Sequence, residues 1–142
     1  MRPKPLVLVV DDEKSLLLIA QRVLQKEGFD VITASDGADG LKKAQENLPD
    51  IIVLDIVMPE MNGYEVCRKL QGSPETCGLP VIFLSVKGNV DEKKGATTQG
   101  LLEINEAFEH GAADFLNKPV TARELIDAIK KALSFHQLLK SG

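Results

Sequence analysis

The sequence predicts an α/β fold in which a parallel β-sheet is covered by helices on both faces. Short apolar runs alternate five times with segments whose apolar residues recur at helical spacing. Two runs, residues 6–10 and 51–54, are continuously apolar, which is typical of strands buried on both faces. The 142 residues contain no internal repeat or linker, so we expect a single domain over residues 1–142.

Five strands and five helices are expected from these patterns, and one of the helices, over residues 101–110, belongs to the longer segment between Ser85 and Lys118. The strands cover residues 6–10, 31–34, 51–55, 81–84 and 114–117. The other helices run from Ser15 to Gly28, from Gly37 toward Leu48, from Asn62 or Gly63 to Gly72, and onward from the capping residue Thr121. The first helix carries Leu16, Leu17, Ile19, Ala20, Val23 and Leu24 at helical spacing. The faces expected to point inward on the others are Ala38, Leu41, Ala44 and Leu48; Val66, Cys67 and Leu70; and Leu125, Ile126, Ile129, Ala132 and Leu133.

The segment between Ser85 and Lys118 is longer than one helix and one short strand require. Residues 87–100 are polar and contain three glycines, which indicates a loop or a frayed helix. Residues 101–110 have helical spacing and end at Gly111. The segment is either a tolerated surface insertion or a surface specific for a partner.

Composition and charge exclude several classes of protein. A net charge of −4 lacks the basic character that nucleic-acid binding needs, and no apolar run is long enough to span a membrane. Cys67 and Cys77 have no metal-ligand partners nearby and fit a reducing cytoplasm. We therefore expect a cytoplasmic protein that contacts neither nucleic acid directly nor a membrane.

Polar side chains stand at the carboxyl ends of the apolar strands. They are Asp11, Asp12, Asp55, Ser85 and Lys118. A single aspartate after a strand is usually a turn residue that hydrogen-bonds its own backbone. Five polar groups at one edge are hard to explain in that way, because open parallel α/β sheets bind their ligands outside this edge. We therefore expect the five side chains to share one crevice.

Three carboxylates in one crevice repel one another, and a divalent cation would compensate their charge. Mg²⁺ suits such a site, because it prefers oxygen ligands and keeps positions open for phosphate oxygens. An ionised Asp55 could then act as a nucleophile, while Lys118 supplies positive charge and Ser85 a hydrogen bond to the phosphoryl oxygens. The predicted chemistry is the formation and loss of an aspartyl phosphate.

Four motifs combine along the chain: Asp11-Asp12 after the first strand, Asp55-x-x-Met58-Pro59-x-x-x-Gly63, Ser85, and Lys118-Pro119 after residues 111–115. In this combination the chain resembles the receiver domains of two-component response regulators, in particular the stand-alone, chemotaxis-type receivers. The resemblance covers about residues 6–139. It implies a flavodoxin-like (βα)5 fold, with a doubly wound five-stranded parallel sheet of order 2-1-3-4-5. The region between the fourth strand and the fourth helix would be lengthened.

The resemblance also implies a role for each matching residue. Asp55 would be the phospho-acceptor. Asp12, Asp55 and the backbone carbonyl of Val57 would bind Mg²⁺, and Asp11 would hold it through water. Lys118 would pair with the phosphoryl group, and the peptide bond that follows it is expected to be cis.

Ser85 and Phe115 would form a switch pair. When Ser85 turns toward the phosphoryl oxygen, Phe115 would move into the vacated space and alter the face made by the fourth helix, fifth strand and fifth helix. Many family members have Thr and Tyr at these positions. Ser85 keeps the hydroxyl group, whereas Phe115 has none to offer a partner.

On this interpretation the chain is a phosphorelay switch, with no enzymatic activity beyond self-phosphorylation and autodephosphorylation at Asp55. A histidine kinase or phosphotransfer protein would act upstream and a target protein downstream, since nothing after Thr121 is expected to fold separately. A Mg²⁺-dependent phosphatase or phosphotransferase would be expected to have a second acid where this chain has Val57. A phosphate-independent, degenerate receiver acting as a binding module would be expected to lack an acid or the lysine, and none is missing.

Overall fold

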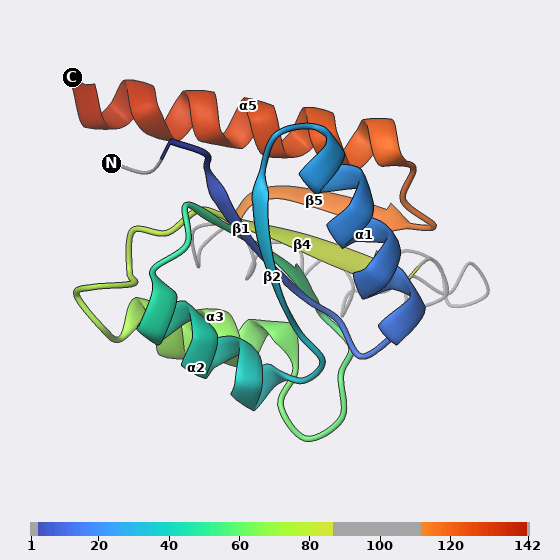
Figure 1. The fold of residues 1–142 in the computed structure, drawn as a ribbon. Coiled ribbons are helices and arrows are strands. Elements are labelled where there is room, and N and C mark those ends of the chain that lie inside the picture. The colour runs from blue at the N-terminus through green and yellow to red at the C-terminus, as the bar shows by residue number, and fades with distance from the viewer. Residues whose placement is uncertain (1–2, 87–111, 142) are drawn as a thin grey trace, which may run out of the picture.

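A five-stranded parallel sheet in the order β2-β1-β3-β4-β5 forms the centre of the molecule (Figure 1). The computed structural model describes residues 3–86 and 112–141. The strands are β1 (Leu6–Val10), β2 (Asp30–Ala34), β3 (Ile51–Asp55), β4 (Val81–Val86) and β5 (Ala112–Lys118). The helices are α1 (Lys14–Lys26), α2 (Gly37–Asn47), α3 (Gly63–Gln71) and α5 (Ala122–Ser141). The predicted fold class and strand order are therefore confirmed.

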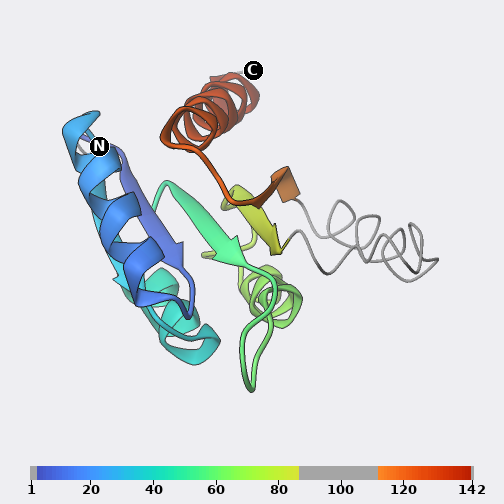
Figure 2. The same ribbon diagram turned by 90° about the vertical axis from the view of Figure 1, so that its right-hand side faces the viewer.

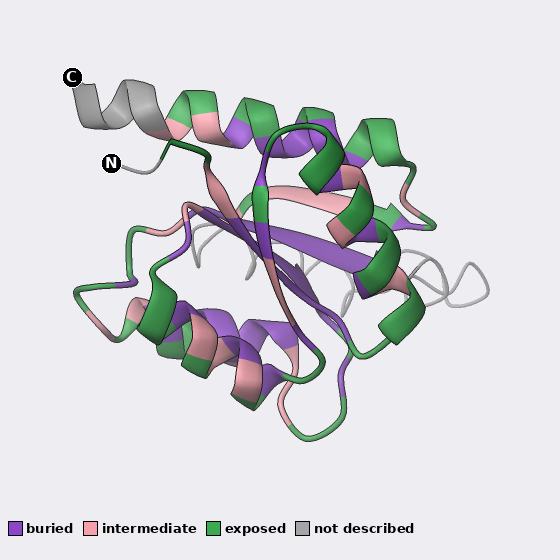
Figure 3. Ribbon diagram, viewed as in Figure 1, coloured by how far each residue is buried: buried purple, intermediate pink, exposed green. Residues whose placement is uncertain are grey.

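Helices α1 and α5 cover one face of the sheet, and α2 and α3 cover the other (Figures 1 and 2). Alternate residues of each strand point to opposite faces. In β3, for example, Ile51 and Val53 pack on the side of α1 and α5, whereas Ile52 and Leu54 pack on the other side. These four side chains have no exposed surface, and Figure 3 shows the same burial along the central strands. The continuous apolar runs are thus strands buried on both faces.

The inward face of α2 differs from the prediction. Ala38 and Leu48 are exposed, and the buried residues of the helix are Gly37, Gly40 and Ala44. A Cβ atom at Gly40 would lie 2.8 Å from a methyl group of Val10, so the helix packs on β1 at a distance that a larger side chain would prevent. Ala44 is buried and Leu41 packs against the same core, as predicted, but glycine contributes nothing to an apolar pattern, so the sequence did not indicate the contacts at Gly37 and Gly40.

Side-chain caps hold the starts of α3 and α5. Asn62 Oδ1 accepts the N–H of Glu65 at 2.9 Å. Thr121 and Glu124 cap each other reciprocally: Thr121 Oγ1 accepts the N–H of Glu124 at 3.1 Å, and Glu124 Oε1 accepts the N–H of Thr121 at 3.4 Å. Both caps lie where the sequence places helix starts.

Some expectations fall outside the described residues, namely the polar segment 87–100, the helix expected over 101–110, and the lengthened region between the fourth strand and fourth helix. Among the helices of residues 3–86 and 112–141, none has the length and apolar character that crossing a membrane would require.

Candidate functional site

Three strands bring a charged side chain to the same edge of the sheet. Asp11 follows β1, Asp55 ends β3 and Lys118 ends β5. All three side chains belong to the α1/α5 face, because the residues two positions earlier pack there: Val9, Val53 and Leu116. Lys118 Nζ lies 2.7 Å from Asp11 Oδ2 and 3.5 Å from Asp55 Oδ2. The structure therefore places these three of the five strand-end side chains together.

Burial dominates the electrostatics of this group. It raises the pKa of Asp55 to about 7, and the negative charge of Asp11 adds to this rise, while the Lys118 ammonium opposes it. Burial also raises the pKa of Asp11, against the nearby Lys118. Burial works against the charge of Lys118, but contact with the acids outweighs it and raises the pKa of this lysine. Without a bound cation, Asp55 is therefore near its titration midpoint at neutral pH.

Asp12 completes an acidic cluster with Asp11 and Asp55. One carboxylate oxygen from each lies within 4.8 Å of the other two. Asp55 Oδ1 is buried and has no hydrogen-bond donor among the described residues. Asp12 is exposed, so the cluster opens to water on one side. Clustered oxygen donors with access to water fit a hard divalent cation such as Mg²⁺, which retains several water ligands.

The loop from Ile56 to Asn62 carries the backbone of Val57 beside the acids. The N–H of Gly63 donates to the Ile56 carbonyl at 2.9 Å, which folds the loop back onto the end of β3. A Cβ atom at Gly63 would overlap the carbonyl oxygen of Asp55. The glycine of the predicted motif therefore allows α3 to begin directly beside Asp55.

Ser85 and Phe115 occupy neighbouring strands on the other face of the sheet. Ser85 is buried at the end of β4, and Phe115 stands opposite Phe83 with ring centroids 6.2 Å apart. Because Phe83 and Ser85 are two residues apart on β4, the pleat places Ser85 on the same face as Phe115. The two residues of the predicted switch pair are thus close in the sheet, with Phe115 only partly buried. The peptide bond between Lys118 and Pro119 is cis, as expected.

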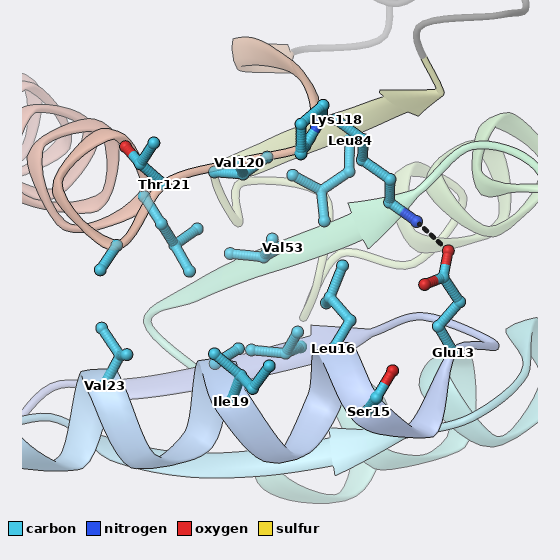
Figure 4. A pocket seen from close by; sticks show the side chains of 15 residues that line it. Glu13, Ser15, Leu16, Ile19, Val23, Val53, Leu84, Lys118, Val120 and Thr121 are labelled. Carbon is cyan, nitrogen blue, oxygen red and sulfur yellow. Dashed lines mark hydrogen bonds and ion pairs between the residues drawn. The ribbon is translucent and has the colours of Figure 1, made fainter.

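An apolar cavity of about 490 Å³ lies between α1 and α5 and reaches Lys118 (Figure 4). Its walls include Leu16, Ile19, Val23, Val53, Leu84 and Leu125. At its rim Glu13 Oε1 lies 3.5 Å from Lys118 Nζ, although 59 % of the Glu13 side chain is exposed. No sequence pattern singles out Glu13 beyond its position directly after the aspartate pair. The lysine therefore has three carboxylate neighbours, one of which faces solvent.

Comparison with known families identifies the chain. The family model for the response regulator receiver domain matches residues 7–130. The chain belongs to this receiver domain family. The match includes all five strand-end residues singled out by their position: Asp11, Asp12, Asp55, Ser85 and Lys118. The resemblance inferred from four short motifs is therefore confirmed.

Several curated proteins resemble this receiver domain over most of its length. The alkaline phosphatase synthesis transcriptional regulatory protein PhoP of Bacillus subtilis is 39 % identical over 127 residues, which are 89 % of this chain and 48 % of PhoP. The transcriptional regulatory protein PrrA of Mycobacterium tuberculosis is 41 % identical over 129 residues, 91 % of this chain and 50 % of PrrA. The response regulator PleD of Caulobacter vibrioides is 37 % identical, and the receiver covers 26 % of it. The chain thus spans half or less of these relatives.

Solved structures of single receivers match almost end to end. A receiver domain protein from Clostridium thermocellum has a TM-score of 0.78 and 32 % identity, and the alignment covers 95 % of this chain and 98 % of that one. The chemotaxis protein CheY4 of Vibrio cholerae has a TM-score of 0.76 and 29 % identity, with 91 % and 98 % coverage. The arrangement of strands and helices is therefore that of a receiver.

Proposed function

We propose that residues 1–142 form one receiver domain that accepts a phosphoryl group on Asp55 and thereby switches a protein-binding surface. The observation that carries this proposal is the position of Lys118 Nζ, 2.7 Å from Asp11 and 3.5 Å from Asp55 at a buried sheet edge. An ammonium held there can stabilise the charge of a phosphoryl group on Asp55. Asp55 Oδ1 lacks a hydrogen-bond donor among the described residues, which leaves this oxygen available as the nucleophile.

In the transfer step an oxygen of Asp55 attacks the phosphorus of a phosphohistidine. The phosphorus–nitrogen bond breaks, and its electron pair remains on the imidazole nitrogen. Mg²⁺ bound at the cluster would neutralise charge on the phosphoryl oxygens. We assign Asp12, Asp55 and the Val57 carbonyl as direct ligands and Asp11 as a ligand through water. On phosphorylation, the Lys118 ammonium would leave a carboxylate oxygen and bind a phosphoryl oxygen. Hydrolysis of the acyl phosphate would then return the domain to its resting state.

The switch would work through Ser85 and Phe115. Phosphorylation gives the Ser85 hydroxyl a new acceptor, and its movement would free space for Phe115 at the surface of β5. The shift between resting and active states cannot exceed the difference in their interaction with the phosphoryl group. The ring of Phe115 would add apolar surface but no hydrogen bond to the switched face.

The partners proposed are a histidine kinase or phosphotransfer protein upstream and a target protein on the switched face. We expect this domain to contact neither nucleic acid nor a membrane, in keeping with its net charge of −4. The chemistry of the domain would be limited to gaining and losing its own phosphoryl group. We place it in the cytoplasm, where Cys67 and Cys77 would stay reduced.

Labelling with a small phosphodonor tests the proposal. Incubation with acetyl phosphate and Mg²⁺ is expected to add one acid-labile phosphoryl group, observed as a single mass increase in intact-protein mass spectrometry. Asp55→Asn is expected to abolish the label, whereas the exposed control Asp127→Asn is expected to retain it. Full labelling of Asp55→Asn would overturn the assignment, and an unlabelled wild type would instead indicate a binding module that does not use phosphate.

A further inference from the structure

The first residue of α2 touches the loop between β3 and α3. A Cβ atom built on Gly37 would lie 2.7 Å from the carbonyl oxygen of Met61, 3.0 Å from Met61 Cβ and 3.1 Å from a methyl group of Val66. The first of these contacts is with backbone, which cannot rotate away as the end of a long side chain can. The start of α2 therefore supports the loop directly, and it does so because residue 37 has no side chain.

The supported loop is short and fixed at both ends. Gly63 N–H bonds to the Ile56 carbonyl at 2.9 Å, and Met61 N–H bonds to the Pro59 carbonyl at 2.7 Å. Glu60, which lies between Pro59 and Met61, adopts a φ of 69°, a left-handed conformation that is uncommon for a residue with a side chain. A displacement of Met61 would therefore also displace the rest of the loop, because these hydrogen bonds leave the backbone little freedom to adjust locally.

The same loop presents the backbone of Val57 to the acids. Burial raises the pKa of Asp55, and the Val57 N–H partly offsets this rise by donating a hydrogen bond to the Asp55 carboxylate. Val57 itself has an exposed side chain, so its place beside Asp55 is set by the backbone of the loop and not by burial of its own side chain. Whatever holds the loop therefore also holds the Val57 amide and carbonyl groups.

We infer that Gly37 is a positioning residue for the cation and phosphoryl site, acting through the Met61 carbonyl on the Val57 backbone. This inference depends on the proposed function, in which the Val57 carbonyl is a Mg²⁺ ligand. Strand β3 ends at Asp55 and holds it in place, and the start of α2 contacts the loop that follows Asp55. Residues that orient metal ligands without touching the metal typically change affinity by 10–100-fold when they are altered.

The variant Gly37→Ala tests the inference, with Gly40→Ala as the matched control. Both add one methyl group to the same face of α2, and the new Cβ atoms would lie 2.7 Å and 2.8 Å from their nearest neighbours. The neighbour of residue 40 is a methyl group of Val10 on β1, not the loop. We expect the Mg²⁺ dissociation constant, measured by calorimetric titration, to rise about tenfold in Gly37→Ala and less than threefold in Gly40→Ala. Comparable affinity losses in the two variants, or an unchanged affinity in Gly37→Ala, would overturn the inference.

A measurement on the wild type keeps the inference testable if Gly37→Ala does not fold. In a ¹⁵N-resolved NMR titration, Mg²⁺ is expected to shift the amide signals of Val57, Met61 and Gly37 together, and to leave that of Gly40 nearly unchanged. A shift at Val57 and Met61 without one at Gly37 would contradict the proposed contact. If Mg²⁺ shifts none of them and acetyl phosphate does not label the wild type, the proposed function itself fails, which is a different outcome.

Discussion

In the folded, cation-free protein, ionisation of Asp55 lowers the free energy of unfolding. Burial raises its pKa from 3.8 to about 7, so between these values the folded state keeps a proton that the unfolded chain releases. Unfolding is therefore favoured progressively as the pH rises from about 4 to about 7. The stability of the cation-free protein is expected to be lower at pH 8 than at pH 5 for this reason.

Replacing Asp55 by Asn should remove this pH-dependent loss of stability, because asparagine has no carboxyl proton to release. In buffer with a chelator at pH 8, we expect Asp55→Asn to be more stable than the wild type, by on the order of 2–4 kcal/mol. At pH 5 the advantage of the variant should be clearly smaller, because only the first part of the loss between pH 4 and pH 7 has accumulated there. Urea unfolding at both pH values measures the difference. An equal advantage at both pH values would mean that the gain does not come from the charge of Asp55.

Lys118 is the counter-charge of the cluster, and its removal should have two separable effects. Lys118→Ala leaves Asp11 and Asp55 buried without their ammonium, which is expected to destabilise the cation-free protein by about 3–5 kcal/mol. The same variant should still bind Mg²⁺, because the proposed ligands are oxygen atoms, but it should bind its partner similarly with and without phosphodonor. Calorimetric titration and partner binding test the two effects. A phosphorylation response as large as that of the wild type would contradict the role given to Lys118.

At the scale of single elements, the start of α3 depends on one cap. Asn62 Oδ1 satisfies the N–H of Glu65, so Asn62→Ala is expected to destabilise the fold by about 1 kcal/mol. Asn62→Asp, which keeps the acceptor oxygen, serves as the control and should lose much less. Chemical unfolding of both variants measures the effect. Equal losses in the two would show that the cap does not stabilise the helix.

The elements differ in how well their sequence predicted them. The strands β1 and β3 were predictable because they are buried on both faces and therefore continuously apolar. Helix α3 was predictable from its cap and from Val66, Cys67 and Leu70, all of which are buried. The face of α2 was predictable only in part: Leu41 and Ala44 pack inward as expected, but its closest contacts are made at glycines, where side chains are absent. A pattern of apolar residues reports which side chains are buried and misses contacts between backbones.

At the scale of the whole molecule, cation binding and stability should be linked. A cation that binds only the folded state stabilises it by about 2.7 kcal/mol at a free concentration 100 times its dissociation constant. We expect Mg²⁺ to raise the unfolding temperature of the wild type, a chelator to reverse this, and Asp55→Asn to show a much smaller rise. Differential scanning calorimetry with and without Mg²⁺ provides the comparison. A rise of the same size in Asp55→Asn would mean that the cation binds elsewhere.

The site could be predicted from the sequence to the extent that it follows from strand topology. Parallel strands end at one edge, which places Asp11, Asp55 and Lys118 together without further information. Glu13 could not be predicted, because its distance from Lys118 depends on how α1 leaves the sheet. The cavity beside it depends likewise on the angle between α1 and α5, which no local pattern encodes.

The three interacting charges come from the first, third and fifth strands, and Lys118 reaches its acids past β4. A nascent chain released before β5 would contain every acid of the cluster but lack the ammonium that balances them. Its acids would then have no positive charge from β5 among them, so the proposed phosphoryl transfer is expected to require the fifth strand as well as the first and third.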